Sequence, residues 1–574
     1  MARIRRLEIT NFRSIAALDW FPSAGINCLI GPGDSGKSTV LEAIDFCLGT
    51  RRSLTFSDTD FHDLELTTSI LIAITLGQLP DELLSIEAYG DFLQGFDSAT
   101  TQIEPEPRAG LETVLTLCLE VGADLEPYWT LYSERANEQG IERDIDFKNR
   151  AALAPARIGT FAAGQLAWGR NTLLTRLTDT KIDLSAGLAD AAREARKTFG
   201  NQAGAQLTQA LDIVNRTAKQ LGVPLKSSQA LLDANSLAIG GGAVTLHNES
   251  GIPLRALGTG SSRLLVAGLQ REAAKEATIA LVDEVEFGLE PHRLTRLLDS
   301  LGAKDSSPPL QVFMTTHSPV ALRELDASQL FILRRNAHGH NVLSASAAAD
   351  VQGTLRSDPE AFLARSILVC EGASEIGLAR GIDQYLTENG YSSFFAQGGA
   401  YVNANGGSPD LCLQRGLALA ALGYRVAVFI DADKAPSPEL VSQLVAAGIP
   451  MITWRAGNAL EDELFQVLPD QALDALLAIA IERKTRELVE AHVRTQSNGS
   501  TTLAAIEAAR PACGYPATTR TLLGKAARTG SNSWFKSQST YHRIAHSIVG
   551  PHASQCDQSF TGVLEQLYGW TNAA

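Results

Sequence analysis

The pattern of apolar and polar residues divides the chain into two successive stretches of strands and helices. In the first stretch, apolar runs predict strands over 3–20, 26–30, 70–74, 111–121, 278–282, 311–316 and 331–335. In the second, they predict strands over 366–370, 424–430 and 451–454. Because strands that alternate with helices are typical of α/β folds, we expect two α/β regions joined by a connection over 346–365.

A helical pattern interrupts the first stretch. Between residues 170 and 235, leucine and alanine recur at helical spacing. The glycines at 200–204 break this pattern and Pro224 ends it, so a small helical insert over 166–240 fits better than a long coiled coil. Such an insert is either a dimerisation surface or a lid packed on its own domain, and the pattern does not decide between them.

Length and composition are those of a multidomain globular protein. The 574 residues exceed what one core holds, so roughly two to four domains are expected. The formal charge of −15 argues against a protein that coats DNA, but it leaves room for a local basic groove. The seven cysteines are scattered and predict neither a disulfide framework nor a zinc site. No apolar run reaches the roughly eighteen residues of a membrane span, so we expect a cytoplasmic protein without membrane contact.

The first candidate for chemistry is a glycine-rich stretch that reads Gly, four residues, Gly-Lys-Ser. It follows an apolar run and precedes a helical pattern, which is the order of a P-loop. Its glycines let backbone N–H groups turn toward a polyphosphate, and the helix adds its positive dipole end. In this motif Lys37 reaches the β and γ phosphates, and Ser38 holds Mg²⁺. The stretch therefore predicts a nucleotide site formed by Gly31, Gly33, Ser35, Gly36, Lys37, Ser38 and Thr39.

A pair of carboxylates matches this loop far downstream. The apolar run 278–282 ends in Asp283 and Glu284, which is the Walker B form. Asp283 is expected to bind Mg²⁺ through water, and Glu284 to polarise the attacking water. Together with the P-loop, the pair predicts binding and hydrolysis of ATP.

The residues ahead of the P-loop indicate which ATPases this chain is similar to. Two strand-like runs flank Asn11-Phe12-Arg13-Ser14, and this order resembles the start of ABC-type ATPases of the SMC and RecF kind. The resemblance implies that Gly258 and Gly260 occupy the place of the signature, which meets a nucleotide held by another subunit. The segment departs from the usual Leu-Ser-Gly-Gly-Gln. The resemblance also implies that His317 contacts the γ phosphate.

The second region carries a further group of carboxylates at strand ends. Glu371 follows the strand at 366–370, Glu375 lies one helical turn later, and Asp431 and Asp433 follow the strand at 424–430. Since the carboxyl ends of adjacent parallel strands meet in one crevice, these side chains are expected to converge. Their mutual repulsion calls for a cation, and hard oxygen ligands of this kind select Mg²⁺ or Mn²⁺.

Glu-Gly and Asp-x-Asp on such strands resemble the Toprim domain. A Toprim domain that follows an ABC-type ATPase resembles the OLD (overcoming lysogenisation defect) family of nucleases, which implies phosphodiester cleavage assisted by one or two metal ions. In this family a later acidic group completes the metal shell, for which Glu461 and Glu463 are the candidates. An acidic helix N-terminus is the alternative explanation for both.

The late part of the chain is locally basic. Residues 481–550 contain ten Lys or Arg against four Glu, which makes them the best candidate for a surface that contacts DNA. A solvated basic helix is the alternative. OLD nucleases carry a late lysine that stabilises the charged transition state, and Lys536 is the first choice for it, with Lys525 second.

The full interpretation is a metal-dependent DNA endonuclease or nickase controlled by ATP at an ABC-type ATPase domain. It assigns residues 1–165 and 241–345 to the ATPase, 166–240 to the insert, 346–365 to a linker and 366–574 to the Toprim nuclease with its basic helical region. The OLD resemblance also implies a homo-oligomer, DNA as substrate, a role in phage defence and, in some members, a helicase partner as in the Gabija system. Two alternatives stay open: a repair or recombination ATPase of the RecF type, and an assembly protein in which ATP only holds subunits together.

Overall fold

The computed structural model describes residues 2–33, 35–49, 54–158, 166–168, 173–177, 195–232, 244–272, 278–336, 339–347, 351–530 and 533–572. These residues form two compact units, Met1–Ala345 and Ser346–Ala574, and each unit has its own hydrophobic core and its own main sheet.

The N-terminal unit is built on one mixed sheet. Its parallel part contains, in spatial order, β15 (Leu330–Asn336), β3 (Ile26–Ile30), β14 (Gln311–Thr315), β13 (Ile279–Val282) and β9 (Ala156–Arg157). Its antiparallel part contains β6 (Ile103–Glu104), β5 (Leu93–Phe96), β7 (Glu112–Val121), β4 (Ile70–Gly77), β1 (Arg3–Phe12) and β2 (Ile15–Trp20), with β8 (Pro127–Tyr132) paired to β7. The two parts meet at β16 (Gly339–Ser344), which runs antiparallel to β15 and parallel to β2. The strands predicted for this region are confirmed.

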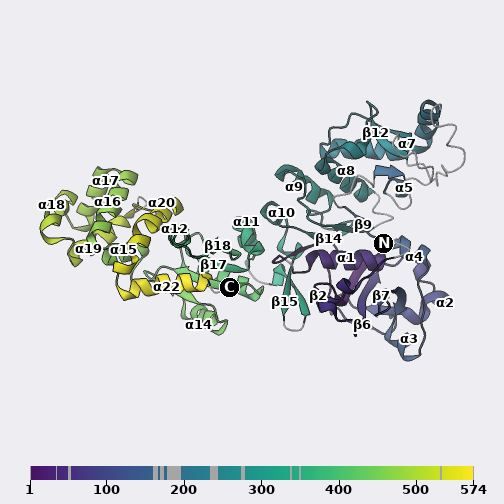
Figure 1. The fold of residues 1–574 in the computed structure, drawn as a ribbon, viewed down its shortest axis with the longest axis horizontal. Helices are drawn as coiled ribbons and strands as arrows, with labels where there is room; N and C mark the ends of the chain where they lie inside the picture. The colour runs from purple at the N-terminus through teal and green to yellow at the C-terminus, as the bar shows by residue number, and fades with distance from the viewer. Residues whose placement is uncertain are drawn as a thin grey trace. The chain divides into compact units, whose positions relative to one another are not determined.

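Helices α1 (Lys37–Leu48), α9 (Pro291–Ser300) and α10 (Pro319–Glu324) come after the parallel strands β3, β13 and β14. The five residues of β3 are all buried, as expected for a central strand, and they lead through the glycine-rich loop into α1 (Lys37–Leu48). Val40, Leu41 and Ile44 recur at helical spacing and are buried. Helix α1 packs against strands of the sheet (Figure 1). The described part of this unit also contains, outside the insert, α2 (Ile86–Tyr89), α3 (Glu134–Glu138), α4 (Phe147–Ala152) and α8 (Thr259–Glu272).

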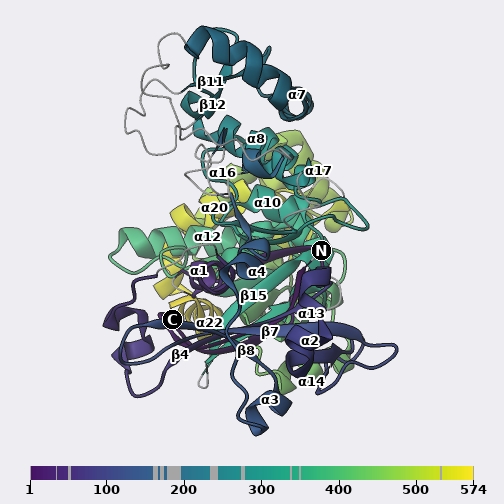
Figure 2. The same cartoon turned by 90° about the vertical axis from the view of Figure 1, so that its right-hand side faces the viewer.

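The insert differs from the expected broken helical pattern. Helix α7 (Ala195–Leu221) runs through Gly200 and Gly204 without interruption, because a glycine inside a helix costs only about 1 kcal/mol and long helical flanks outweigh it. Figure 2 shows α7 beside β11 (Ser228–Leu232) and β12 (Val244–Asn248). These two strands form a small antiparallel sheet with β10 (Ala167–Trp168), so the insert is mixed and not all helical; it also contains α5 (Leu173–Arg176). The helical pattern around 184–192 lies outside the described residues.

The C-terminal unit is built on a four-stranded parallel sheet. Its spatial order is β18 (Gly399–Asn403), β17 (Ser366–Cys370), β19 (Arg425–Ile430) and β20 (Met451–Thr453). The pairing places Cys370 opposite Asn403 on one side and Phe429 on the other, so the strand ends lie at one edge. Strand β18 was not predicted, because its Gly-Ala-Tyr-Val-Asn sequence is too short to show a period.

Helices follow these strands and extend the same core. Helices α12 (Ala373–Glu388), α13 (Pro409–Ala421) and α14 (Pro438–Ala446) connect the strands. The segment 346–365 contains α11 (Val351–Ser357) and a 3₁₀ turn (Pro359–Leu363), and the fully buried Leu355 and Phe362 make it part of this unit. After β20 come α15 (Leu460–Val467), α16 (Asp470–Lys484), α17 (Arg486–Gln496), α18 (Leu503–Cys513), α19 (Ala517–Ala527), α20 (Gln538–Ile544), a π-helical turn (Ala545–Val549), α21 (Gly550–His552) and α22 (Gln558–Asn572).

Two glycines bring α12 and α20 unusually close together. A Cβ added at Gly377 would lie 2.5 Å from the carbonyl oxygen of Gln538, and one at Gly381 would collide with that of His542. Tyr541, between these two positions, is fully buried. The C-terminal helices therefore pack directly on the helix that follows β17. Among the helices described, none has the length and apolarity that crossing a membrane requires.

Candidate functional site

The glycine-rich loop of the N-terminal unit has the geometry of a phosphate cradle. Gly36 has φ +89°, and a Cβ there would lie 3.0 Å from the hydroxyl of Ser14, so only glycine suits this position. Lys37 is buried, and its Nζ donates hydrogen bonds to the carbonyl oxygens of Gly31 (3.1 Å) and Pro32 (2.8 Å). The ammonium group thus lies across the loop, where a bound polyphosphate would need a cation.

The structure brings the predicted magnesium ligands of this site together. The hydroxyl of Ser38 donates to Asp283 Oδ1 at 3.1 Å, and Thr315 Oγ1 donates to the same oxygen at 2.6 Å. This contact arises because β14 lies between β3 and β13 in the sheet. Glu284 adopts φ +45°, a costly conformation for a residue with a side chain, and its N–H donates to Thr315 Oγ1 at 2.8 Å.

Two residues that the sequence did not single out hold this region in place. Glu286 accepts hydrogen bonds from the hydroxyl of Thr316 (2.6 Å) and the N–H of His317 (2.7 Å), and so fixes the backbone at the exposed His317. Arg263 is fully buried and donates to the carbonyl oxygens of Asp283, Glu284 and Phe287.

The segment predicted as a signature packs on the same loop. Helix α8 begins just after Gly258, and a Cβ added at Gly260 would lie 2.5 Å from the carbonyl oxygen of Gly288. Arg263 of α8 donates hydrogen bonds to the backbone carbonyls of Asp283 and Glu284, which follow β13. The start of α8 and the Walker B loop thus form one packed element.

The C-terminal unit holds a second pocket, of about 460 Å³, which we call the carboxylate pocket. It lies at the carboxyl edge of the parallel sheet and is lined by the acidic residues Glu371, Glu375, Asp431, Asp433 and Glu461. The convergence of the predicted carboxylates follows from the pairing of β17 with β19. These two strands are neighbours in space, although β18 comes between them in the sequence.

Backbone hydrogen bonds orient these carboxylates. The N–H of Asp431 donates to Glu371 Oε2 (3.2 Å), and the N–H of Leu460 donates to Asp431 Oδ1 (3.0 Å). The N–H of Gly372 donates to Glu375 Oε2 (2.8 Å), which caps α12. Among the described residues, no group of three or more His, Cys, Asp or Glu is already arranged around a single metal position.

Burial and mutual repulsion shift the protonation of these groups. Burial, with the nearby charges of Glu461 and Glu371, raises the pKa of Glu375 to about 7. Burial, with the charges of Glu375 and Glu461, raises the pKa of Asp431 well above its usual value. Burial raises the pKa of Glu371 and that of Glu461 as well. A site in which neighbouring carboxyl groups resist ionisation gains most from a bound cation.

Basic and hydroxyl groups border the same pocket. Lys536 lines it, as proposed, whereas Lys525 is not among the residues that line it. Arg528, which no sequence motif singles out, contacts Asp433 and Asp462, each at 3.1 Å. Ser533 also lines the pocket, and its buried hydroxyl has no hydrogen-bond partner among the described residues.

Tyr541 adds a further group beside the carboxylates. Its side chain is fully buried, and burial together with the adjacent carboxylate of Glu461 raises the pKa of the phenol well above its usual value. Tyr541 comes this close to the carboxylates because Gly377 and Gly381 of α12 let α20 pack tightly against it. No sequence motif identifies these two glycines.

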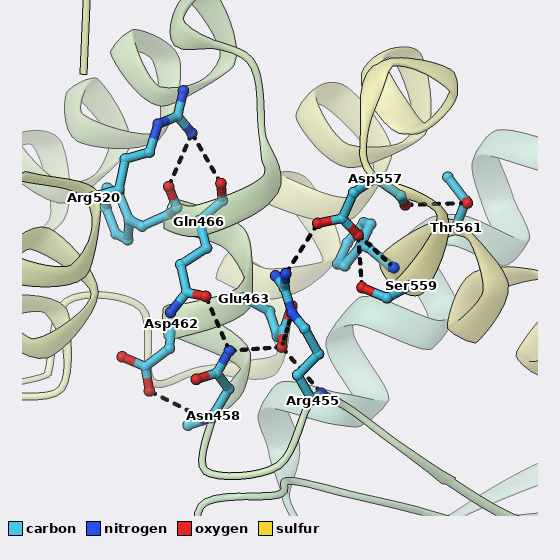
Figure 3. A network of polar contacts seen from close by, with 12 residues as sticks. Arg455, Asn458, Asp462, Glu463, Gln466, Arg520, Asp557, Ser559 and Thr561 are labelled. Carbon is cyan, nitrogen blue, oxygen red and sulfur yellow. Dashed lines mark hydrogen bonds and ion pairs between the residues drawn. The ribbon is translucent and has the colours of Figure 1, made fainter. Parts of the chain in front are cut away.

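The structure separates the two late acidic candidates. Glu461 lines the carboxylate pocket. Glu463 instead forms a bidentate ion pair with Arg455, at 2.7 and 3.0 Å, and accepts from Asn458 (Figure 3). Arg455 also contacts Asp557 at 3.0 Å, which ties α15 to the residues before α22. Glu463, predicted together with Glu461 as a metal ligand, is thus a buried carboxylate paired with Arg455 and does not line the pocket.

The expected basic surface is largely neutralised within its own unit. Six of its arginines form ion pairs, in the pairs Arg486–Glu507, Arg494–Glu490, Arg510–Asp474, Arg520–Asp470, Arg528–Asp433 and Arg543–Glu482. Within the described ranges, the basic residues of 481–550 that have no ion pair are Arg483, Lys484, Lys525 and Lys536. The count of charges overstated the free positive charge, because it ignored partners from outside the segment.

The fold and the nucleotide site of the N-terminal unit define a P-loop ATPase domain. Residues 26–323 match the family model "AAA domain, putative AbiEii toxin, Type IV TA system", and this match extends over more than half of the chain. The chain belongs to this family of AAA ATPases.

Curated relatives match over short segments only. A DNA replication and repair protein RecF from Prosthecochloris aestuarii is 45% identical over 49 residues, which are 8% of this chain and 13% of that protein. RecF from Vibrio cholerae is 56% identical over 50 residues, which are 9% of this chain and 14% of that protein. The chain thus spans only a small fraction of the length of these relatives.

Solved structures of SMC heads are also similar. The SMC head domain from Thermotoga maritima has a TM-score of 0.31 at 13% identity and covers 60% of this chain and 98% of its own. The second structure is an Smc head with an extended coiled coil, derived from Pyrococcus furiosus and bound to the C-terminal domain of ScpA. Its TM-score is 0.37 at 16% identity, and the match covers 62% of this chain and 100% of that chain. Likeness at this level says nothing about what the chain binds or cuts.

Proposed function

We propose that the protein is a metal-dependent DNA endonuclease or nickase of the OLD kind, in which a Toprim domain over 366–574 cuts DNA. The observation that carries this proposal is the carboxylate pocket, where five acidic side chains meet at the carboxyl edge of a parallel sheet. Carboxylates in one crevice at such an edge, with raised pKa values and basic groups at the rim, are suited to phosphodiester chemistry.

The donors of this pocket fit Mg²⁺ or Mn²⁺. Oxygen atoms of Glu371, Glu375, Asp431, Asp433 and Glu461 are hard ligands, and no thiol or imidazole lies among the residues that line the pocket. These residues would hold one or two ions, which would polarise the phosphate and activate water. Lys536 and Arg528 add positive charge where the phosphate would gain negative charge, and the hydroxyl of Ser533 offers it a hydrogen bond.

The ATPase domain, in this proposal, controls the cut. Lys37, Ser38 and Asp283 would bind ATP with Mg²⁺, and Glu284 would orient the attacking water. Gly258 and Gly260, at the start of α8, would meet a nucleotide held by a second copy of the chain, and His317 would contact its γ phosphate. Nucleotide binding would then assemble a homo-oligomer. A cytoplasmic role in phage defence, with a helicase partner, completes the proposal by its resemblance to OLD members of the Gabija kind.

A plasmid-nicking assay tests the proposal. Wild type, Glu371→Ala and Glu439→Gln would be compared with Mg²⁺, Mn²⁺ or Ca²⁺, with and without ATP. Glu439 is an exposed carboxylate on α14 outside the pocket, so its variant should nick like wild type. Glu371→Ala should lose nicking by about 100-fold or more, the usual loss on removing a ligand or charge stabiliser. Nicking that survives in Glu371→Ala would place the activity elsewhere.

A second candidate, favoured by the RecF matches, is a repair or recombination ATPase whose C-terminal unit only binds DNA. The combined change Asp431→Ala and Asp433→Ala separates the two. Under the nuclease proposal it abolishes nicking in every metal. Under the RecF-type alternative the wild type itself does not nick, while it still binds DNA and hydrolyses ATP.

A further inference from the structure

A second cavity lies beside the carboxylate pocket in the C-terminal unit. It measures about 370 Å³, and we call it the aromatic cavity. Its walls come from α12, β18 and the segment 358–364, and they include Asp358, Arg380, Phe395 and Tyr401. Its volume falls within the range of small-molecule sites.

The aromatic cavity and the carboxylate pocket share a wall. Asn403, at the end of β18, lines both of them. On α12, Glu375 faces the carboxylate pocket and the next residue, Ile376, lines the aromatic cavity. A nucleic acid whose phosphate lies among the carboxylates therefore has this cavity next to it.

One side of the aromatic cavity is a stacking surface. The side chain of Phe395 is 51% exposed, although it is aromatic and lies next to a packed core. The guanidinium of Arg380 lies 5.3 Å from the centre of the Phe395 ring, and the ring of Tyr401 meets it edge-on at 5.5 Å. A half-exposed aromatic ring with a cation over one face attracts a flat, polarisable ring.

The polar groups of the cavity suit a base and not a phosphate. Tyr401 is 8% exposed, and its hydroxyl has no hydrogen-bond partner among the described residues, which is costly unless a ligand supplies one. Asp358 and Glu360 contribute carboxylates, which repel a phosphate but accept hydrogen bonds from an amino group. Arg380 forms no ion pair within the described ranges, so its positive charge in the cavity is not paired with a carboxylate.

We propose that the aromatic cavity receives one unstacked nucleobase that carries an exocyclic amino group, from the DNA strand whose phosphate lies in the carboxylate pocket. The inference rests on the proposed function. The base stacks on Phe395, its amino group faces Asp358 and Glu360, and the Tyr401 hydroxyl pairs with a ring or carbonyl acceptor. Cytosine, adenine and guanine carry such an amino group and thymine does not, so the cut falls next to one of the former three.

Photo-crosslinking tests where the base lies. The full chain, in Ca²⁺, is irradiated with a single-stranded oligonucleotide that contains 5-iododeoxycytidine, and the crosslinked peptide is identified by mass spectrometry. The proposal expects the crosslink at Phe395 or Tyr401. A crosslink confined to peptides outside the aromatic cavity, or the absence of any crosslink, overturns it.

Binding measurements test the contribution of the cavity. Phe395→Ala should weaken binding of a cytosine-containing oligonucleotide about tenfold, the usual effect of losing one stacked base. Tyr391→Ala removes another exposed aromatic side chain of the same unit outside the cavity and should bind like wild type. Asp358→Ala should reduce the preference for cytosine over an all-thymine oligonucleotide. Equal binding by Phe395→Ala and Tyr391→Ala would contradict the proposal.

The two proposals fail in different ways. If wild type nicks plasmid in Mg²⁺ or Mn²⁺ while the crosslink misses the cavity, the nuclease stands and the base site is wrong. If the crosslink lies at Phe395 or Tyr401 while no metal supports nicking, the base site stands and the nuclease is wrong.

Discussion

The indole Nε1 of Trp534 donates a hydrogen bond to Nδ1 of His492 at 3.1 Å, and both side chains are buried. This bond requires a neutral imidazole, because only an unprotonated Nδ1 accepts. Burial, with the charge of Lys484, lowers the pKa of His492. Trp534 belongs to the short segment that also places Ser533 and Lys536 in the carboxylate pocket, so one buried histidine supports part of that pocket's wall.

The first prediction concerns the pH dependence of this bond. Because the pKa of His492 is lowered in the folded state, the unfolded chain binds the proton more readily, and the free energy of unfolding falls as the pH drops below about 6.5. His492→Gln keeps an acceptor for the indole and does not titrate. Urea unfolding at about pH 7.5 and 5.5 should show that wild type loses about 1 kcal/mol more than this variant. His552→Gln serves as the control, and a loss in His492→Gln as large as in wild type would contradict the prediction.

The second prediction concerns the nucleotide site. Lys37→Ala removes the ammonium that bridges the loop carbonyls of Gly31 and Pro32, so ATP with Mg²⁺ should no longer raise the melting temperature. Lys148→Ala removes an exposed lysine of the same unit and should leave the shift as in wild type. The measurement is a thermal shift over a range of ATP concentrations. A full shift in Lys37→Ala would mean that nucleotide binds elsewhere.

The third prediction separates ATP binding from hydrolysis. Glu284→Gln keeps the shape of the Walker B loop but removes the charge that would orient water, so turnover should fall by at least about 100-fold while ATP still binds. If nucleotide assembles the chains, mass measured in solution with ATP should be larger for this variant than for Lys37→Ala. An equal mass in solution for Glu284→Gln and Lys37→Ala would show that nucleotide does not drive assembly.

The fourth prediction concerns Arg528, whose guanidinium contacts Asp433 and Asp462. A metal ion that binds Asp433 must compete with this cation, so Arg528→Ala should bind Mn²⁺ more tightly, by roughly two- to fivefold for a partly exposed pair. Calorimetric titration measures the affinity. Arg543→Ala, which breaks an exposed pair with Glu482, is the matched control and should not change it. Weaker binding in Arg528→Ala would show that the arginine organises the ligands and does not compete.

The fifth prediction concerns the contact between α12 and α20. Gly377→Ala places a methyl group 2.5 Å from the Gln538 carbonyl, so it should destabilise the chain by about 1–3 kcal/mol. Gly562→Ala is the control: no atom lies within 4 Å of its added Cβ in α22, and it should stabilise by about 0.5–1 kcal/mol. Chemical unfolding of both variants measures the difference. A neutral effect of Gly377→Ala would mean that the two helices separate at little cost.

The sequence predicted the parts of this molecule whose pattern is local. The largely apolar sequences of β3, β17 and β19 predict buried parallel strands, and the residues after them lie where the strand ends converge. The shared site of Ser38 and Asp283 could be predicted because the P-loop and Walker B motifs have fixed roles. The α/β class of the ATPase domain followed from the same runs.

Features that depend on contacts between residues distant in sequence could not be predicted from the sequence. Glu461 and Glu463 lie two positions apart on α15, and only the position of Arg455 decides that Glu463 is an ion-pair residue. Arg528 reaches Asp433 across 95 positions, and no spacing rule connects them. The sequence predicted a break in α7 at its glycines, because the cost of glycine in a helix is a local property. The packing of α7 against β11 could not be read from the local pattern.

The close contact between α12 and α20 connects the two cavities of the C-terminal unit. Gln538, whose carbonyl touches Gly377, lines the aromatic cavity, while Tyr541, one turn further on, borders the carboxylates. A larger residue at Gly377 would push both side chains outward together. A substitution at Gly377 would therefore change the walls of both the aromatic cavity and the carboxylate pocket.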